Sequence, residues 1–160
     1  MNIEDSIGEF RSSVDAFVEK VEAADPALYE KAPAPGEWSI TEIAAHTAEI
    51  FAYWAGQFEH LYRQPGSKFG RTADDAGRAR FVETHRHTSM DDLIRRIRIG
   101  EADAIASLRA FGDDQWTTVS GIHPARGEMT VEAAAKMVLL DHAQEHLKQV
   151  DDTIAKLHSA

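Results

Sequence analysis

The sequence predicts an all-α protein in which a single domain, residues 1–160, forms a four-helix bundle. Three observations support this fold class. Apolar residues recur at helical spacing in four long segments. All five prolines lie outside these segments, where they favour loops. A length of 160 residues is that of one domain, and a protein of this size buries a sizeable hydrophobic core.

The first predicted helix covers about residues 4–23. Its apolar face consists of Ile7, Phe10, Val14, Phe17 and Val21. We expect it to end before Pro26, because a proline disfavours helical backbone in the residue that precedes it. Residues 24–37 contain three prolines and one glycine, so they are predicted to form a loop.

The second predicted helix has a clear start at Ser39. A serine followed three residues later by Glu42 is a capping box, in which each side chain accepts a hydrogen bond from a free backbone N–H. The helix runs to about Gln64, ahead of Pro65. It is rich in aromatic residues, and we expect most of them to pack in the core.

Residues 65–88 form a long connection, which leaves room for a short helix around residues 74–83. Connections between the helices of a bundle usually take about 2–8 residues. A longer one is a crossover, which allows the second and third helices to run parallel. The arginines of this segment, Arg71, Arg78 and Arg80, form either a solvated, ion-paired strap or a rim that recruits anions. We favour the strap, because surface charge is normally solvated.

The third predicted helix begins near Asp91, with Ser89 or Thr88 as its cap, and ends near Phe111. Gly100 lies in its middle, at a cost of about 1 kcal/mol relative to alanine. That cost suggests close packing at this position, although a tolerated local weakness explains it equally well.

The last part of the chain combines an irregular segment with the fourth helix. Residues 112–129 are predicted to be irregular, with a short extended piece over 117–120. Thr130 then caps a helix of about residues 131–157.

The composition narrows the functional classes. The formal net charge is −10, whereas nucleic-acid binding depends mostly on basic residues that neutralise phosphates, so no nucleic-acid partner is expected. No run of about 18 apolar residues exists, so we expect no membrane segment. The N-terminal residues do not resemble a signal peptide, which makes a cytoplasmic location the default. The chain has no cysteine, so a metal ion would need histidine or oxygen ligands and any thiol would be external.

Two histidines on the fourth predicted helix are the most informative feature of the sequence. His142 and His146 are four residues apart, which places their imidazoles close enough to share a metal ion. At about 100° per residue, both fall on the apolar face and point inward. His46, at the edge of the apolar face of the second helix, is the candidate third ligand. Three imidazoles with an open position are typical of a catalytic metal site, but the spacing equally permits histidines hydrogen-bonded inside the core.

The other polar candidates have ordinary explanations. We expect surface positions for the remaining five histidines, which are His60, His85, His87, His123 and His158. Glu42 and Glu49 flank His46 by about one helical turn and either orient its imidazole, supply a fourth ligand, or serve as a cap and a solvated charge. We favour the last. Gln149 either faces the site or lines the bundle.

Three short motifs follow one another along the chain. Trp38, Ser39, Glu42 and His46 open the second helix; Gly127–Thr130 leads into the fourth; and His142, His146 and Gln149 follow within it. Together these motifs resemble the DinB/YfiT-like superfamily. The resemblance extends over nearly the whole chain in element order and length. In one departure, Leu147 follows His146, where many relatives have a second histidine.

The resemblance implies a bundle with up-down-down-up topology, often dimeric, so a homodimer is expected. It also implies one divalent ion, commonly zinc or nickel, held by residues that match His46, His142 and His146. Some relatives are thiol-dependent S-transferases or isomerases that use a low-molecular-weight thiol, and many have no assigned activity.

Two functions follow as hypotheses. In the first, the protein is a metal-dependent thiol S-transferase, isomerase or hydrolase, in which the ion activates a thiol or water toward a small-molecule substrate. Glu42, Tyr53 or Gln149 would then orient the substrate. In the second, the protein is a non-catalytic metal-binding or interaction bundle, whose ion joins the second and fourth helices.

Overall fold

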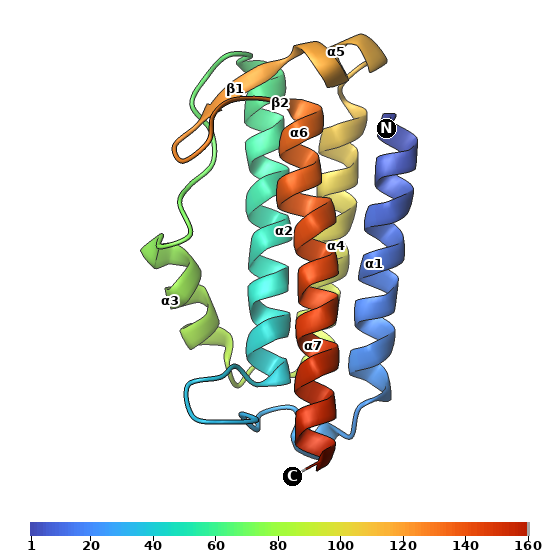
Figure 1. Ribbon diagram of the computed structural model, residues 1–160, viewed down its shortest axis with the longest axis vertical. Helices are drawn as coiled ribbons and strands as arrows, with labels where there is room; N and C mark the ends of the chain where they lie inside the picture. Colours follow the sequence, from blue (N-terminus) through green and yellow to red (C-terminus); the bar gives the residue numbers. More distant parts are fainter. Residues whose placement is uncertain (160) are drawn as a thin grey trace.

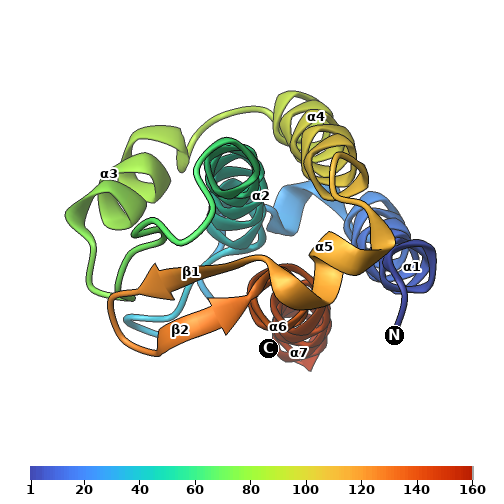
Figure 2. The same ribbon diagram turned by 90° about the horizontal axis from the view of Figure 1, so that it is seen from above.

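The computed structural model describes residues 1–159 and shows long helices that lie side by side (Figure 1). The protein is mostly helical, as the sequence predicts. The long helices are α1 (Ile3–Ala23), α2 (Ile40–Arg63), α4 (Met90–Arg109) and a last rod made of α6 (Val131–Ala135), the π-helical segment η2 (Lys136–Asp141) and α7 (His142–Ser159). A 3-10 turn, η1 (Pro26–Leu28), lies in the first loop. Residues 65–88, which were predicted to form the crossover and are called the crossover segment below, contain α3 (Ala76–His85), which lies beside α2 (Figures 1 and 2).

The capping side chains predicted from the sequence start the helices as expected. Ser39 Oγ accepts a hydrogen bond from the backbone N–H of Glu42 at 3.2 Å, and the Ser39 N–H donates to Glu42 Oε1 at 3.2 Å. Thr130 caps α6 through the Ala133 N–H, and Ser89 caps α4. These caps satisfy N–H groups that have no partner within the helix, so they define where each helix begins.

Helices α2 and α4 pack closely at Gly100. A β-carbon at this glycine would lie 3.0 Å from Phe51 Cβ and 3.2 Å from the backbone nitrogen of Ala52. The close packing suggested by the sequence is therefore confirmed. The core continues from there, and its largest fully buried side chains include Phe10, Phe17, Phe51 and Phe58.

The segment before the last rod is more ordered than predicted. Residues Asp113–Thr118 form α5, and a hairpin of β1 (Ser120–His123) and β2 (Gly127–Thr130) follows at one end of the bundle (Figure 2). The prediction of an extended piece at 117–120 is wrong for residues 117 and 118, which are helical.

The hairpin also pairs with the crossover segment. The Ile122 N–H donates to the carbonyl of Ser67 at 2.9 Å, and the Phe69 N–H donates to the carbonyl of Ile122 at 3.1 Å. This pairing joins segments more than fifty positions apart, so local patterns could not predict it. It fixes β1 and the start of the crossover segment against each other beside α2. In the part of the chain from residue 1 to 159, no helix is long and apolar enough to cross a membrane.

Candidate metal centre

The bundle brings the three predicted histidines together from two helices. The ring centres of His46 on α2 and His146 on α7 are 4.8 Å apart, with the planes nearly perpendicular at 89°. The rings of His142 and His146 are 5.8 Å apart. Imidazoles that share one tetrahedral ion at a metal–nitrogen distance of about 2.1 Å have ring centres about 5 Å apart. The spacing of these rings is therefore compatible with one shared ion.

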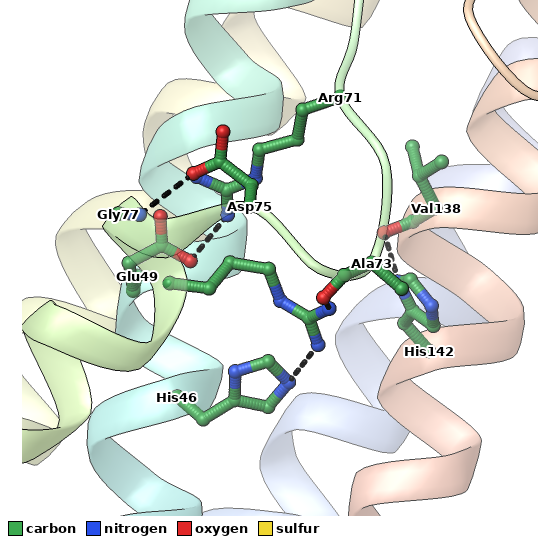
Figure 3. Close-up of polar contacts among 9 residues, drawn as sticks. His46, Glu49, Arg71, Ala73, Asp75, Gly77, Val138 and His142 are labelled. Carbon is green, nitrogen blue, oxygen red and sulfur yellow. Dashed lines mark hydrogen bonds and ion pairs between the residues drawn. The ribbon is translucent and has the colours of Figure 1, made fainter.

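Burial of the histidines follows the predicted helix faces. His46 is 3% exposed and His146 is 7% exposed, so both face the interior, as predicted. His142 is half-buried and lies on the wall of a cavity. Figure 3 shows His46 and His142 on two different helices, with the loop that carries Ala73 passing near them.

The hydrogen-bond partners assign the same tautomer to all three rings. The Nδ1–H of His142 donates to the carbonyl of Val138 at 3.3 Å, and the Nδ1–H of His146 donates to Gln149 Oε1 at 3.4 Å. Arg78 Nη2, which can only donate, lies 3.2 Å from Nε2 of His46. Each ring therefore carries its lone pair on Nε2. A metal ion binds neutral imidazoles through a ring nitrogen that carries a lone pair, so each ring presents Nε2 as its ligating atom.

Two buried ring nitrogens lack a hydrogen-bond partner among residues 1–159. They are Nδ1 of His46 and Nε2 of His146. A buried polar atom without a partner costs about 1–3 kcal/mol, so it indicates a missing ligand or strain. For Nε2 of His146, a metal ion is a chemically suitable partner. The donor set therefore fits a divalent ion, because it consists of neutral imidazoles that suit zinc and nickel alike.

The side chains are not arranged as a closed metal site. Across residues 1–159, no group of three His, Asp or Glu side chains converges to hold an ion. In this arrangement Nε2 of His46 accepts a hydrogen bond from the Arg78 guanidinium. That cation occupies the lone pair that a metal ion would use.

The electrostatics around the rings favour neutral imidazoles. Burial, with smaller contributions from the neighbouring His146 and Arg78 side chains, lowers the pKa of His46 to about 3. Burial likewise lowers the pKa of His146 to about 4, helped by His142. Both rings are therefore unprotonated at neutral pH, as ligands of a metal ion must be.

We expect the metal-free protein to lose stability as the pH falls below about 6.5. The folded pKa values of His46 and His146 lie below the ordinary value near 6.5, so the unfolded chain binds more protons between pH 6.5 and 4. The free energy of unfolding then decreases by up to about 1.4 kcal/mol per pH unit for each histidine. Urea unfolding in EDTA at several pH values measures this slope. His146→Asn should lower the slope, His158→Ala should not, and equal slopes in all three proteins would contradict the assignment.

The acidic neighbours of His46 have other partners. Glu42 caps α2, as favoured from the sequence. Glu49 was expected to be a solvated charge, and this is wrong, because its carboxylate pairs with Arg71 at 2.5 Å, with both side chains nearly buried (Figure 3). The Arg71 guanidinium also lies over the Tyr53 ring, 3.7 Å from its centre. The predicted strap is therefore ion-paired at Arg71, as expected, but this side chain is nearly buried and not solvated.

A cavity of about 430 Å³ opens beside the histidines. Its wall includes Ile50, Trp54, Arg71, Arg78, Met137 and His142. The indole of Trp38 packs against the His46 ring, with the ring centres 5.0 Å apart and the planes tilted by 59°. Of the three predicted ligands, His142 lines the cavity, so a small molecule in the cavity can reach this ring.

His123 is the site residue that sequence reasoning missed. It was expected at the surface, but it is 6% exposed, stacked on Trp54 at 6.1 Å, and part of the cavity wall. The expectation is wrong because His123 ends β1, whose pairing with the crossover segment turns the ring inward. A surface position is confirmed for His87 and His158, whereas His60 and His85 are half-buried.

Comparison with known proteins agrees with this architecture. The family model of the DinB superfamily matches residues 9–150. No curated protein matches the chain. Among solved structures, YfiT from Bacillus subtilis, a probable metal-dependent hydrolase with an unusual four-helix bundle topology, is similar with a TM-score of 0.81 at 13% identity. The match covers 98% of this chain and 87% of YfiT.

Two further structures share the fold at 13% identity. The mycothiol-dependent maleylpyruvate isomerase gives a TM-score of 0.68, and the match covers 98% of this chain but 61% of the isomerase. The colibactin self-resistance protein ClbS, solved in complex with a dsDNA, gives 0.70 over 95% of this chain and 94% of its own. Because the family model matches most of the chain, this protein belongs to the DinB superfamily.

Proposed function

We propose that this protein is a metal-dependent enzyme that holds one divalent ion, zinc or nickel, with His46, His142 and His146. It acts on a small molecule, either with an external low-molecular-weight thiol as an S-transferase or isomerase, or with water as a hydrolase. The observation that carries the proposal is the common tautomer of three neighbouring rings, each with its lone pair on Nε2. The names of two structural neighbours, a metal-dependent hydrolase and a mycothiol-dependent isomerase, support it.

The chain's own residues would prepare the site. The carbonyl of Val138 and Oε1 of Gln149 keep the proton on Nδ1 of His142 and His146, which orients both rings. Trp38 packs against the His46 ring. The apolar part of the cavity wall, with Trp54 and Met137, can hold the carbon skeleton of a substrate. A bound divalent ion would lower the pKa of a thiol or water toward neutrality.

Metal analysis of untagged protein tests this proposal. We expect about one zinc or nickel ion per chain after loading. His46→Ala, His142→Ala and His146→Ala should each weaken the apparent affinity at least about 100-fold, since losing a ligand costs more than losing its hydrogen-bond partner. His85→Ala is the matched control, because this half-buried histidine stacks on Phe81 outside the site. Unchanged metal content in the three ligand variants would refute the proposal.

Turnover then separates the enzyme from the non-catalytic alternative. A metal-loaded sample is incubated with a model electrophile and an added thiol, or with a hydrolysable ester or amide. Activity that depends on the three histidines supports an enzyme. The alternative, an ion that joins α2 and α7 without catalysis, predicts that a chelator lowers the melting temperature while no substrate is converted.

Three further expectations belong to the same proposal. The up-down-down-up order, with a crossover between α2 and α4, is supported by the path of the chain in Figure 1. A homodimer is proposed from the family resemblance. A small molecule is proposed as the partner in preference to nucleic acid, because the net charge of −10 repels phosphates.

A further inference from the structure

Arg78 carries a charge that no carboxylate of the described chain neutralises. It extends from α3 and is half-buried on the wall of the 430 Å³ cavity. Its guanidinium donates to the carbonyl of Ala73 at 2.5 Å and to Nε2 of His46 at 3.2 Å, and both acceptors are neutral. By contrast, the nearby Arg71 pairs with Glu49 and lies 3.9 Å from Asp75. Burying part of a cation without a counter-ion costs free energy, so an anion that bound to Arg78 would recover part of this cost.

Arg78 and a metal ion would compete for the same lone pair. Nε2 of His46 has one lone pair, which accepts either the N–H of Arg78 or the metal. A bound ion would also place a second positive charge beside the guanidinium. Metal binding at His46 therefore requires Arg78 to give up this hydrogen bond. At least one N–H group of the guanidinium then lacks a partner in the cavity.

The cavity offers little within the chain to replace the lost bond. Two carboxylates line it, Asp141 and Glu145. Asp141 is already paired with Lys136 at 2.8 Å. Glu145 is exposed, so an ion pair with it would be screened by water and weak. A guest with its own carboxylate, placed inside the cavity, would be the better partner, since the planar guanidinium binds carboxylates through two parallel hydrogen bonds.

We propose that the Arg78 guanidinium changes its hydrogen-bond partner when the metal site is loaded. In the metal-free protein it occupies the lone pair of His46, and in the metal-loaded protein it binds the carboxylate of the small molecule that enters the cavity. This inference rests on the proposed metal function and adds a substrate class, a small carboxylate with an apolar part that fits against Trp54 and Met137. Because binding linkage is reciprocal, metal and carboxylate should each strengthen the binding of the other.

The first experiment measures metal affinity without any activity assay. Full-length protein stripped with EDTA is titrated with Zn²⁺ against a chromophoric chelator. Arg78→Ala should bind Zn²⁺ about tenfold or more tightly than the wild type, because no charge-assisted hydrogen bond has to be broken. Arg80→Ala, which removes an exposed arginine from the same helix, should change the affinity less than about twofold. Arg78→Lys keeps the positive charge but lacks the planar guanidinium, so its Zn²⁺ affinity should lie between those of Arg78→Ala and the wild type.

The second experiment tests the carboxylate. Succinate, compared with sodium chloride at equal ionic strength, should raise the Zn²⁺ affinity of the wild type and have little effect on Arg78→Ala. An equal rise in both proteins would mean that succinate binds the metal alone, which overturns the role of Arg78. Equal or weaker Zn²⁺ binding by Arg78→Ala also overturns it while leaving the three-histidine site in place. Failure of every protein to bind Zn²⁺ would overturn the proposed function and this inference together.

Discussion

Replacing Glu49 with alanine is expected to lower the free energy of unfolding by about 3 kcal/mol. The carboxylate pairs with Arg71 at 2.5 Å, and the side chains of Glu49 and Arg71 are only 11% and 13% exposed. The variant would leave a nearly buried guanidinium with Asp75 at 3.9 Å as its remaining carboxylate neighbour, so the loss should lie at the low end of the range for a broken buried pair. Urea unfolding at pH 7 measures the change.

A second ion pair on the same helix provides the control. Glu59 pairs with Arg63 at the surface of α2, with both side chains more than half exposed, so Glu59→Ala should cost no more than about 0.5 kcal/mol. The double variant Glu49→Ala/Arg71→Met should be more stable than Glu49→Ala alone, because no unpaired charge remains. Similar losses in Glu49→Ala and Glu59→Ala would show that the Arg71 pair contributes no more than a surface pair.

The Glu49 pair also links the fold to the site. Arg71 lies in the crossover segment and Glu49 lies one turn beyond His46 on α2. The pair therefore anchors to α2 the segment that carries Arg78 toward the histidines. Glu49→Ala should make this segment more mobile and weaken the contact of Arg78 with His46. Like Arg78→Ala, it should therefore raise the affinity for Zn²⁺.

The helices were predictable because their signals are local. Capping side chains and apolar spacing lie within a few residues of the feature they determine, so α1, predicted at 4–23, is Ile3–Ala23 in the structure. The start of α2 at Ser39 follows from hydrogen bonds between residues three apart. The prolines likewise indicated where helices end and loops begin, because each acts on the residue that precedes it. The two strands of the hairpin are close in sequence but only four residues long, so their local signal is weak. The pairing of β1 with the crossover segment was missed because the paired residues are more than fifty positions apart.

The site was only partly predictable for the same physical reason. His46 and His146 lie on apolar helix faces, and periodicity alone indicated that they are buried. The segment Lys136–Asp141 is π-helical, so it turns through a smaller angle per residue than the 100° assumed along the helix. The faces before and after it are therefore offset, and His142 lies half-buried on the cavity wall. Nothing local to Arg78 indicates that its guanidinium reaches His46, 32 positions earlier.

Gly70→Ala is expected to cost about 2–4 kcal/mol of unfolding free energy, through two separate effects. Gly70 has a φ of +79°, a conformation in which a β-carbon is strained by about 1–2 kcal/mol. A β-carbon there would also lie 2.7 Å from Cδ2 of His123 and 2.8 Å from Cη2 of Trp54, both part of the cavity wall. The Gly70 N–H donates to Gln57 Oε1 at 2.7 Å, which hinders the backbone from moving away.

Gly66 separates the two effects, because it has the same backbone conformation with open space around it. Its φ is +81°, and a β-carbon would meet no atom within 4 Å. Gly66→Ala should therefore show the strain alone, about 1 kcal/mol, and the difference between the two variants measures the contact with the His123 and Trp54 rings. Equal losses of unfolding free energy in the two variants would mean that these rings move at little cost, so that the cavity wall is not rigid. A larger loss at Gly70 would mean that the wall is rigid, which a pocket needs if it is to hold a substrate in one orientation beside the histidines.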